Sequence, residues 1–344
     1  MRVDEDGAMA LATRLLADRG TPAAHAAMQA RVLVEGELKG HPSHGLQRLP
    51  RILSRIERDL IDASAAGMQN WRSSSYLEVD GQKGLGPVVA HAALDRIAER
   101  ARETGIAVAG IRNSNHLGML AHYVECVADR GQIGIAMSSS EALVHPYGGT
   151  RALLGTNPLA IAVPTAGRPL VVDLATGLVS MGKIHHHAAN GVAIPQGWAR
   201  DSNGKPTTDA AAATRGSIAP FGDAKGYALG MALELLVASI AGSALAPDVR
   251  GTLDADNICN KGDVLIVIDV GAEPALLRRF SDYLERIRTS IPADPLRPVT
   301  VPGDGASSRR EQAHKDGIEI SPKLWDELNA LSYSNNPPVR GHGQ

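Results

Sequence analysis

Residues 76–80, Tyr-Leu-Glu-Val-Asp, alternate between apolar and polar side chains, which is the pattern of a half-buried strand. A glycine-rich turn at 81–86, an amphipathic segment at 87–104 and the apolar run Ile-Ala-Val-Ala-Gly-Ile at 106–111 follow. The pattern then predicts a helix at 117–130 and strands at 132–137, 159–164, 170–173 and 264–270. This alternation of strands and helices predicts a layered α/β core.

The first seventy residues have helical spacing instead. Thr21-Pro22 is a typical helix start, with threonine as the N-cap and proline at the first helical position. After a break at residues 40–42, Ser43 is the expected N-cap of a further helix that continues through Ile56. We expect a helical domain at 1–72, completed by the proline-rich tail at about 292–344, and a core domain at 73–291.

Composition and charge exclude several classes of protein. The net charge of -2 leaves no large basic surface for nucleic acid, and 3% aromatic residues argue against base-stacking platforms. The acidic N-terminus lacks the apolar segment of a signal peptide, so a cytoplasmic protein is expected. Residues 227–246 are long enough to span a membrane, but Glu234 in their middle favours a buried helix at a subunit interface.

Two histidine segments are the main candidates for chemistry: Ser-His-Gly-Leu-Gln-Arg at 43–48 and Ser-Asn-His-Leu-Gly at 114–118. On a helix, His44 and Arg48 would lie on one face. An imidazole transfers protons near neutral pH, and a guanidinium binds a carboxylate through two parallel hydrogen bonds. The pair therefore suits a small acid whose hydroxyl or carbonyl group changes protonation, whereas the alternative is that both histidines are surface or capping residues.

The glycines at 84–86 do not form a standard dinucleotide fingerprint, although they follow a strand and precede a helix. Val89 occupies the place of the third glycine, and Pro87 lacks an amide that could meet a phosphate. Better candidates for binding phosphate or carboxylate oxygens are the polar turns at 146–149 and 155–158, together with Lys225 at the start of the long apolar helix.

The triple histidine at 185–187 raises the possibility of a metal site. Three consecutive side chains on regular structure cannot all face one ion, and no acidic residue accompanies them at ligand spacing. Solvent exposure is the favoured interpretation, with contact to a cofactor phosphate as the second. A non-redox metal-dependent enzyme that uses His185–His187 stays open as an alternative. A binding protein built on an inactive enzyme is a third, but the presence of both His44 and His116 argues against it.

Together these segments resemble the type-2 malate/L-lactate dehydrogenase family. The matching pieces lie in family order between about residues 40 and 245: Ser43-His44-Gly45 with Arg48, 115–118, 146–149, 155–160, 173–176, 182–184, 197–199, 206–209 and 225–227. The resemblance implies a three-layer, non-Rossmann fold with a mixed sheet, and a homodimer whose cofactor lies near the subunit interface.

The resemblance also implies an NAD(P)-dependent oxidoreductase that transfers hydride between nicotinamide and C2 of a small 2-hydroxy or 2-oxo acid. A close alternative is reduction of a cyclic 2-imino acid in the same site. His44 and His116 would be catalytic, with His44 the favoured acid/base, while Ser43 and Arg48 would bind the substrate, Arg48 through the C1 carboxylate. We expect the cofactor along Ser140, Thr156, Asn157, Asp173, Lys183, His185 and Lys225. No acidic residue occurs at 175–199, which favours NADP over NAD, and no metal site is expected.

Overall fold

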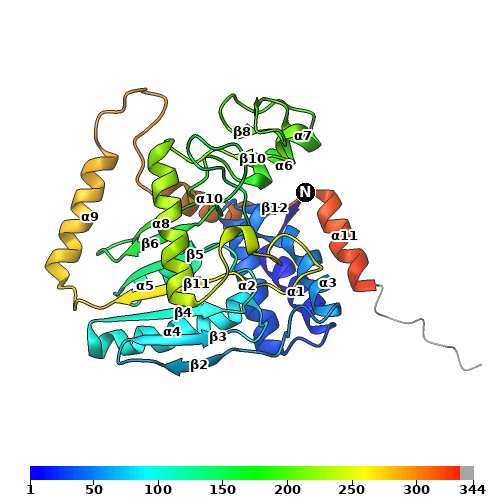
Figure 1. Ribbon diagram of the computed structural model, residues 1–344. Helices are drawn as coiled ribbons and strands as arrows, with labels where there is room; N and C mark the ends of the chain where they lie inside the picture. Colours follow the sequence, from blue (N-terminus) through cyan, green and yellow to red (C-terminus); the bar gives the residue numbers. More distant parts are fainter. Residues whose placement is uncertain (334–344) are drawn as a thin grey trace, which may run out of the picture.

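A seven-stranded sheet forms the centre of the computed structural model, which describes residues 1–333 (Figure 1). In spatial order its strands are β2 (Met68–Trp71), β3 (Tyr76–Asp80), β4 (Ile106–Arg112), β11 (Asp263–Ile268), β5 (Ile133–Ser138), β6 (Leu159–Val163) and β7 (Leu170–Leu174). The β3–β4 pair is parallel and the other pairs are antiparallel, so the sheet is mixed, as predicted.

Helices cover both faces of this sheet. The helices α4 (Gly86–Thr104) and α5 (Ala121–Ala128) pack on one face, and α8 (Ala224–Ala241) packs on the other. Within β11, Leu265 and Val267 belong to the core with α4 and α5, whereas Val264 belongs to the core under α8. A strand buried on both faces needs a continuous apolar run, and Val-Leu-Ile-Val-Ile at 264–268 supplies it. The predicted three-layer α/β architecture is therefore confirmed.

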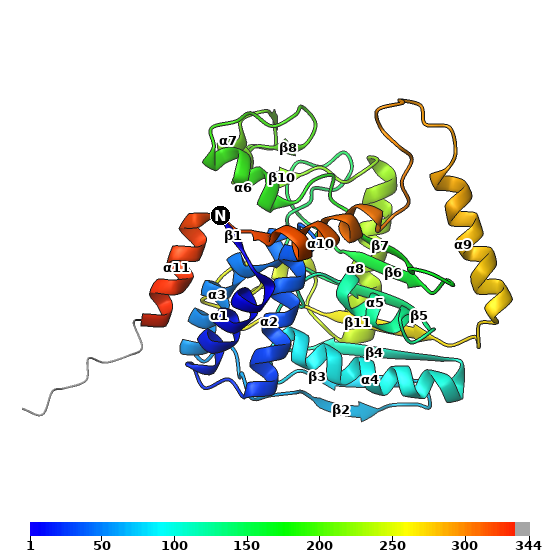
Figure 2. The same ribbon diagram turned by 180° about the vertical axis from the view of Figure 1, so that it is seen from behind.

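The two ends of the described chain pack together beside the sheet (Figure 2). The N-terminal part contributes β1 (Arg2–Val3), α1 (Glu5–Ala17), α2 (Ala23–Leu38) and α3 (Leu49–Glu57), and the C-terminal part contributes α10 (Asp304–Asp316), β12 (Ile318–Glu319) and α11 (Pro322–Tyr333). The strands β1 and β12 pair, and Leu328 lies in one apolar cluster with Leu15 and Leu33. Residues 334–344 of the predicted tail lie outside the described residues, and the domain boundaries themselves stay a prediction.

Two further parts extend from this body. The helix α9 (Pro274–Arg288) stands at the opposite side of the sheet from the N-terminal helices (Figure 1). A small lobe between β7 and α8 has its own apolar cluster. Its elements are α6 (Met181–Ala189), β8 (Ala199–Arg200), β9 (Pro206–Thr207), α7 (Ala210–Ala213) and β10 (Ser217–Ile218).

The predicted helix beginning at Ser43 is wrong in its first turns. The chain forms two short 3-10 turns, Pro42–His44 and Leu46–Arg48, and α3 begins only at Leu49. Gly45 between them is extended, with φ -98° and ψ -149°, and the carboxylate of Glu37 accepts the Leu46 N–H at 2.6 Å. Pro50 in the first turn of α3 has no N–H to donate to Leu46 O, and its ring would clash with that carbonyl in a continuous helix, so the chain before Leu49 forms separate turns.

The predicted helix at 117–130 is also too long, because α5 begins only at Ala121. Gly118 has a φ of 82°, a left-handed conformation that a regular right-handed helix cannot contain, so no helix runs from Leu117 into α5. Residues 114–120 therefore form a loop that presents His116 beside the end of the sheet.

By length and composition, α8 is the one helix in the described part of the chain that could cross a membrane. In the structure its mid-helix Glu234 is buried, and the carboxylate accepts hydrogen bonds from Gly155 N–H (3.1 Å), from the Asn157 side-chain amide (2.7 Å) and from Ala246 N–H. The opposite face leaves three large apolar side chains exposed: Met231, Leu235 and Leu236. The charge is thus part of the internal packing of the protein.

Replacing Leu328 with alanine should lower the free energy of unfolding by about 3–5 kcal/mol, because the side chain is fully buried between the two chain ends. Urea denaturation followed by circular dichroism measures this loss. Leu296→Ala is the matched control: that side chain is 90% exposed, so its loss should stay within about 0.5 kcal/mol. Equal effects of the two substitutions would contradict the packing of α11 on the N-terminal helices.

Candidate active site

A cavity of about 280 Å³ lies at one end of the sheet, where several loops meet. The 3-10 turns at 42–48 and the loop at 114–120 supply His44 and His116, and His41 lines the cavity from directly before the first turn. Three serines at the end of β5 and directly after it, residues 138–140, form part of the wall with Thr156. Further lining residues are Leu143, Pro158, Asp173 to Ala175, Ser180 to Gly182, Thr252, Leu253 and Lys261. Segments that are far apart in sequence are thus brought to one site.

The two predicted histidines lie side by side, with ring centroids 5.6 Å apart and planes tilted by 37°. The Nδ1 of His116 accepts the N–H of Gly118 at 2.8 Å, so the neutral ring carries its proton on Nε2. The Nδ1 of His44 lies 3.1 Å from the hydroxyl of Ser43. Each ring is therefore oriented by a bond on Nδ1, and the Nε2 atoms are left for other partners.

Burial and positive neighbours keep both imidazoles neutral. Burial, followed by charge repulsion from Arg48 and His41, lowers the pKa of His44 to about 3. Burial also lowers the pKa of His116 well below its ordinary value, with Arg48 as the strongest charged neighbour. A neutral imidazole can accept the proton of a hydroxyl group, and one with its proton on Nε2 can donate a hydrogen bond to a developing alkoxide.

Arg48 lies next to these rings. Its Nε donates to the backbone carbonyl of Ser43 at 2.8 Å, and the guanidinium lines the cavity. Within residues 1–333 its terminal nitrogens have no hydrogen-bond acceptor. Burial lowers the pKa of Arg48 to about 10, followed by repulsion from Arg51, so the group stays charged at neutral pH. The side chain is half-buried, and a cation that is partly removed from water without a counterion is a ready partner for a carboxylate.

Three of the seven predicted cofactor residues line the same cavity: Ser140, Thr156 and Asp173. The hydroxyl of Ser140 accepts the Thr156 N–H at 2.9 Å and lies 3.3 Å from the Thr156 hydroxyl. The carboxylate of Asp173 accepts the N–H of Ala121 at 2.7 Å. With the serines at 138–139 and 180, these groups form a path of small polar side chains that suits an amide or ribose hydroxyl. A whole dinucleotide is larger than the cavity, so only its nicotinamide end would fit there.

The other four predicted cofactor residues lie outside the cavity wall. Asn157 is buried and donates to Gly230 O and to Glu234. Lys183 and His185 lie exposed on α6, with the Lys183 ammonium 4.8 Å from the centre of the Trp198 ring. Lys225 is exposed in the first turn of α8. Contact of these residues with a cofactor stays a prediction.

Lys261 and Thr252 are among the lining residues that were not predicted from the sequence. The ammonium of Lys261 lines the cavity and is paired with the buried Asp263 carboxylate, which also accepts the Ser138 hydroxyl at 2.6 Å. Thr252 also lines the cavity, and Glu141 fixes it by accepting both its N–H and its hydroxyl at 2.9 Å. The only indication in the sequence is a lysine and an aspartate directly before the most apolar strand.

The histidines of α6 have separate partners. The Nδ1 of His187 lies 3.1 Å from Ala193 O and its ring packs against Trp198, whereas His186 contacts Asn190. No group of three or more His, Cys, Asp or Glu side chains within residues 1–333 could hold a metal ion.

The comparison with known families decides between the open alternatives. The family model described as malate/L-lactate dehydrogenase matches residues 3–329. The chain belongs to this family. It is therefore an NAD(P)-dependent oxidoreductase, as the resemblance implied.

Individual relatives agree with this assignment. The chain is 36% identical to a (2R)-3-sulfolactate dehydrogenase (NADP(+)) of Chromohalobacter salexigens, over 94% of this chain and 96% of that one. It is 34% identical to a Δ1-pyrroline-2-carboxylate reductase of Pseudomonas fluorescens, over 95% and 97% of the two chains. The crystal structure of a dehydrogenase from Sinorhizobium meliloti superposes with a TM-score of 0.93 at 55% identity, covering 96% of this chain and 98% of that one.

Glu37 should make stability depend on pH. Burial raises its pKa to about 7, although the hydrogen bond from Leu46 N–H lowers it, and the ordinary value is 4.5. The folded state therefore binds this proton more tightly, so the stabilisation is fully present below pH 4.5 and is lost as the pH rises through 7. Relative to Glu37→Gln, the native protein should lose on the order of 3 kcal/mol between pH 4.5 and pH 8.

Urea unfolding of the two proteins at a series of pH values measures this difference. Glu99→Gln serves as the control, because Glu99 is exposed on α4 and should give a profile parallel to that of the native protein. A Glu37→Gln profile that also runs parallel would show that the buried carboxyl does not titrate in this range.

Proposed function

We propose that this enzyme transfers hydride reversibly between nicotinamide and C2 of a small 2-hydroxy or 2-oxo acid. The observation that carries the proposal is the pairing of two neutral imidazoles with an unpaired, half-buried guanidinium on one cavity wall. The guanidinium of Arg48 would bind the C1 carboxylate through its two terminal nitrogens. Such binding would bring the C2 oxygen within reach of an imidazole, which is the geometry that proton transfer at C2 needs.

We assign the proton transfer to His44: in the oxidation direction its neutral imidazole would accept the proton of the C2 hydroxyl, and in reduction the imidazolium would return a proton to the C2 oxygen. His44 lies in the same pair of short turns as Arg48, so the distance between proton donor and carboxylate clamp is set by a few residues of chain. His116, whose Nε2 carries the proton, would donate a hydrogen bond to the C2 oxygen as negative charge develops there. Ser43 orients His44 through the contact at Nδ1. When bound, the nicotinamide ring would supply or accept the hydride.

For the cofactor we propose NADP or tolerance of both nucleotides. Lys183 and His185 follow the polar wall at 180–182, and no acidic residue occurs from 175 to 199 to bind a ribose diol. One relative carries NADP(+) in its name, which supports the same preference. Asn157 and Lys225 stay in the proposed cofactor set, and a cytoplasmic location stays a prediction.

Reduction of a cyclic 2-imino acid is the alternative reaction, supported by the pyrroline-2-carboxylate reductase among the relatives. It needs the same carboxylate clamp and the same proton donor. The deciding experiment follows the absorbance of NADPH and of NADH with small 2-oxo acids and, separately, with cyclic imines. Turnover of the imines alone would exclude the hydroxy-acid reaction.

His44→Ala should lower kcat by about a hundredfold or more, because the reaction loses its proton carrier. His116→Ala removes a hydrogen-bond donor from the same oxygen and should be the smaller loss. Steady-state kinetics on both variants separate the two roles, with melting temperatures as a check on folding. A hundredfold loss in His116→Ala alone would assign the proton transfer to His116.

We also propose a homodimer in which α8 contributes to the interface. One side of this helix is apolar and exposed, through Met231, Leu235 and Leu236. Exposed apolar patches of this kind are uncommon on monomers and often mark an interface. Sedimentation equilibrium should therefore give a dimer mass, and Leu235→Glu should raise the dissociation constant at least tenfold by placing a charge in the interface. An active monomer of the native chain at assay concentrations would contradict this arrangement.

A further inference from the structure

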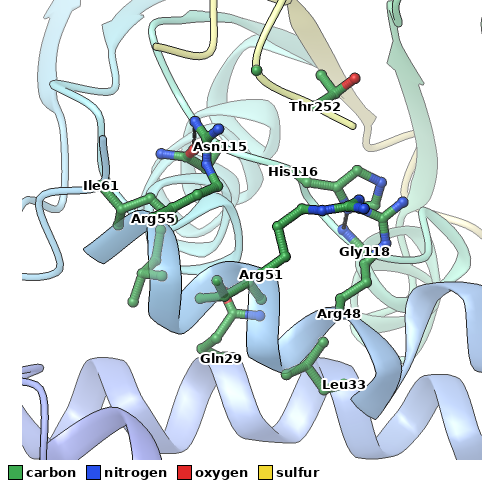
Figure 3. Close-up of a pocket in the computed structure, with 13 residues that line it drawn as sticks. Gln29, Leu33, Arg48, Arg51, Arg55, Ile61, Asn115, His116, Gly118 and Thr252 are labelled. Atoms are coloured by element: carbon green, nitrogen blue, oxygen red, sulfur yellow. Dashed lines mark hydrogen bonds between the residues drawn. The ribbon is translucent and has the colours of Figure 1, made fainter. Parts of the chain in front are cut away.

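A second, smaller cavity of about 30 Å³ adjoins the main one (Figure 3). Both cavities are lined by Arg48, His116, Gly118 and Thr252, so these residues lie between them. The outer wall comes from α3, which adds Arg51 and Arg55. The small cavity therefore continues from the point where the reacting carbon would lie.

The three arginines differ in how they are bound. The terminal nitrogens of Arg55 donate to Asp254 O at 2.9 Å and to the Asn115 side-chain oxygen at 3.1 Å, so this buried side chain holds two loops together. Arg48 is the proposed carboxylate clamp. Arg51 has no hydrogen bond or ion pair with any other side chain of residues 1–333, and Figure 3 shows it reaching from α3 towards His116.

The charges around this cavity are not balanced. None of its lining residues is acidic, and both site histidines are neutral. The remaining nearby cation, Lys261, is neutralised by Asp263. Arg48 is half-buried and Arg51 is exposed, and neither has a counterion among residues 1–333; they lie close enough that Arg51 lowers the pKa of Arg48. A ligand with two anionic groups would remove both imbalances, whereas a monoacid removes only one.

We propose that Arg51 binds a second anionic group of the substrate and selects small dianionic 2-oxo and 2-hydroxy acids over monoanionic ones. This inference rests on the proposed function. The C1 carboxylate lies on Arg48, C2 faces the histidines, and a carboxylate or sulfonate on C3 or C4 occupies the small cavity. Its volume of about 30 Å³ leaves room for one such group on a short chain.

The test compares two acids with the same four-carbon chain, oxaloacetate and 2-oxobutanoate. The native enzyme should favour oxaloacetate at least tenfold in kcat/KM. Arg51→Gln should lower kcat/KM for oxaloacetate about 10- to 100-fold, the range for loss of a charge-assisted contact, and should leave 2-oxobutanoate within about threefold. Arg51→Lys should recover part of the loss. Arg102→Gln, an exposed arginine on α4, is the control and should match the native enzyme on both acids.

Several results would overturn the assignment. An equal loss on both acids would show a general role for Arg51, such as binding a cofactor phosphate, and a rise in the KM for NADPH would identify that role. A native enzyme that prefers 2-oxobutanoate or a cyclic imine would exclude a dianionic substrate.

A further measurement separates this inference from the proposed function. If the native enzyme reduces neither acid with either nucleotide, the proposed function fails, and binding then decides the role of Arg51. Malate should raise the melting temperature of the native protein more than 2-hydroxybutanoate does. In Arg51→Gln the two acids should raise the melting temperature equally. Equal rises for the two acids in the native protein would overturn the role of Arg51.

Discussion

Glutamate carboxylates that accept backbone N–H groups hold the loops around the active-site cavity. Three of them act in this way: Glu37 accepts from Leu46, Glu141 from Thr252 and Leu253, and Glu234 from Gly155 and Ala246. Such bonds involve an ionised or strongly polar acceptor and are stronger than bonds between neutral groups. Each joins a loop to another part of the chain, so the shape of the cavity depends on internal polar contacts as well as on apolar packing.

This arrangement also explains the charge pattern of the site. These three carboxylates face the backbone of the loops, whereas the side chains that line the two cavities include imidazoles, hydroxyl groups and guanidinium groups, with Asp173 as the one acidic side chain among the described lining residues. Positive charge is therefore concentrated where an acidic ligand would bind, in partly buried surroundings. Electrostatic interactions are stronger there than at an exposed surface, so a few cations determine which ligands are accepted.

Much of the core could be predicted from the sequence, because its strands show clear local patterns. The strand at 76–80 matches the prediction, and the apolar run at 264–270 corresponds to β11. By contrast, β2 has no alternating apolar pattern, since its residues are exposed or half-buried at the sheet edge, and it was not predicted. The helix α9 was also not predicted, although its sequence is amphipathic. Edge strands lack the burial that produces a readable pattern.

The site was predicted less completely, for physical reasons that differ between residues. His44, His116, Ser43 and Arg48 do converge on one cavity, but through two 3-10 turns instead of one helical face. Glu37, whose carboxyl group accepts the Leu46 N–H, lies in the preceding helix and gives no local indication of this contact. Lys261 could not be recognised either, because its place beside the cavity depends on β11 inserting between β4 and β5.

The central place of β11 also has a consequence for synthesis in the cell. Ser138 at the end of β5 leaves the ribosome 125 positions before Asp263 at the start of β11 (263 − 138). At about 5–20 residues per second, the edges of β4 and β5 wait roughly 6–25 s for the strand that joins them. During this interval two apolar strands have unpaired edges, a state that favours wrong pairing between neighbouring nascent chains. The yield of folded protein should therefore depend on chaperones that cover these edges until translation passes residue 268.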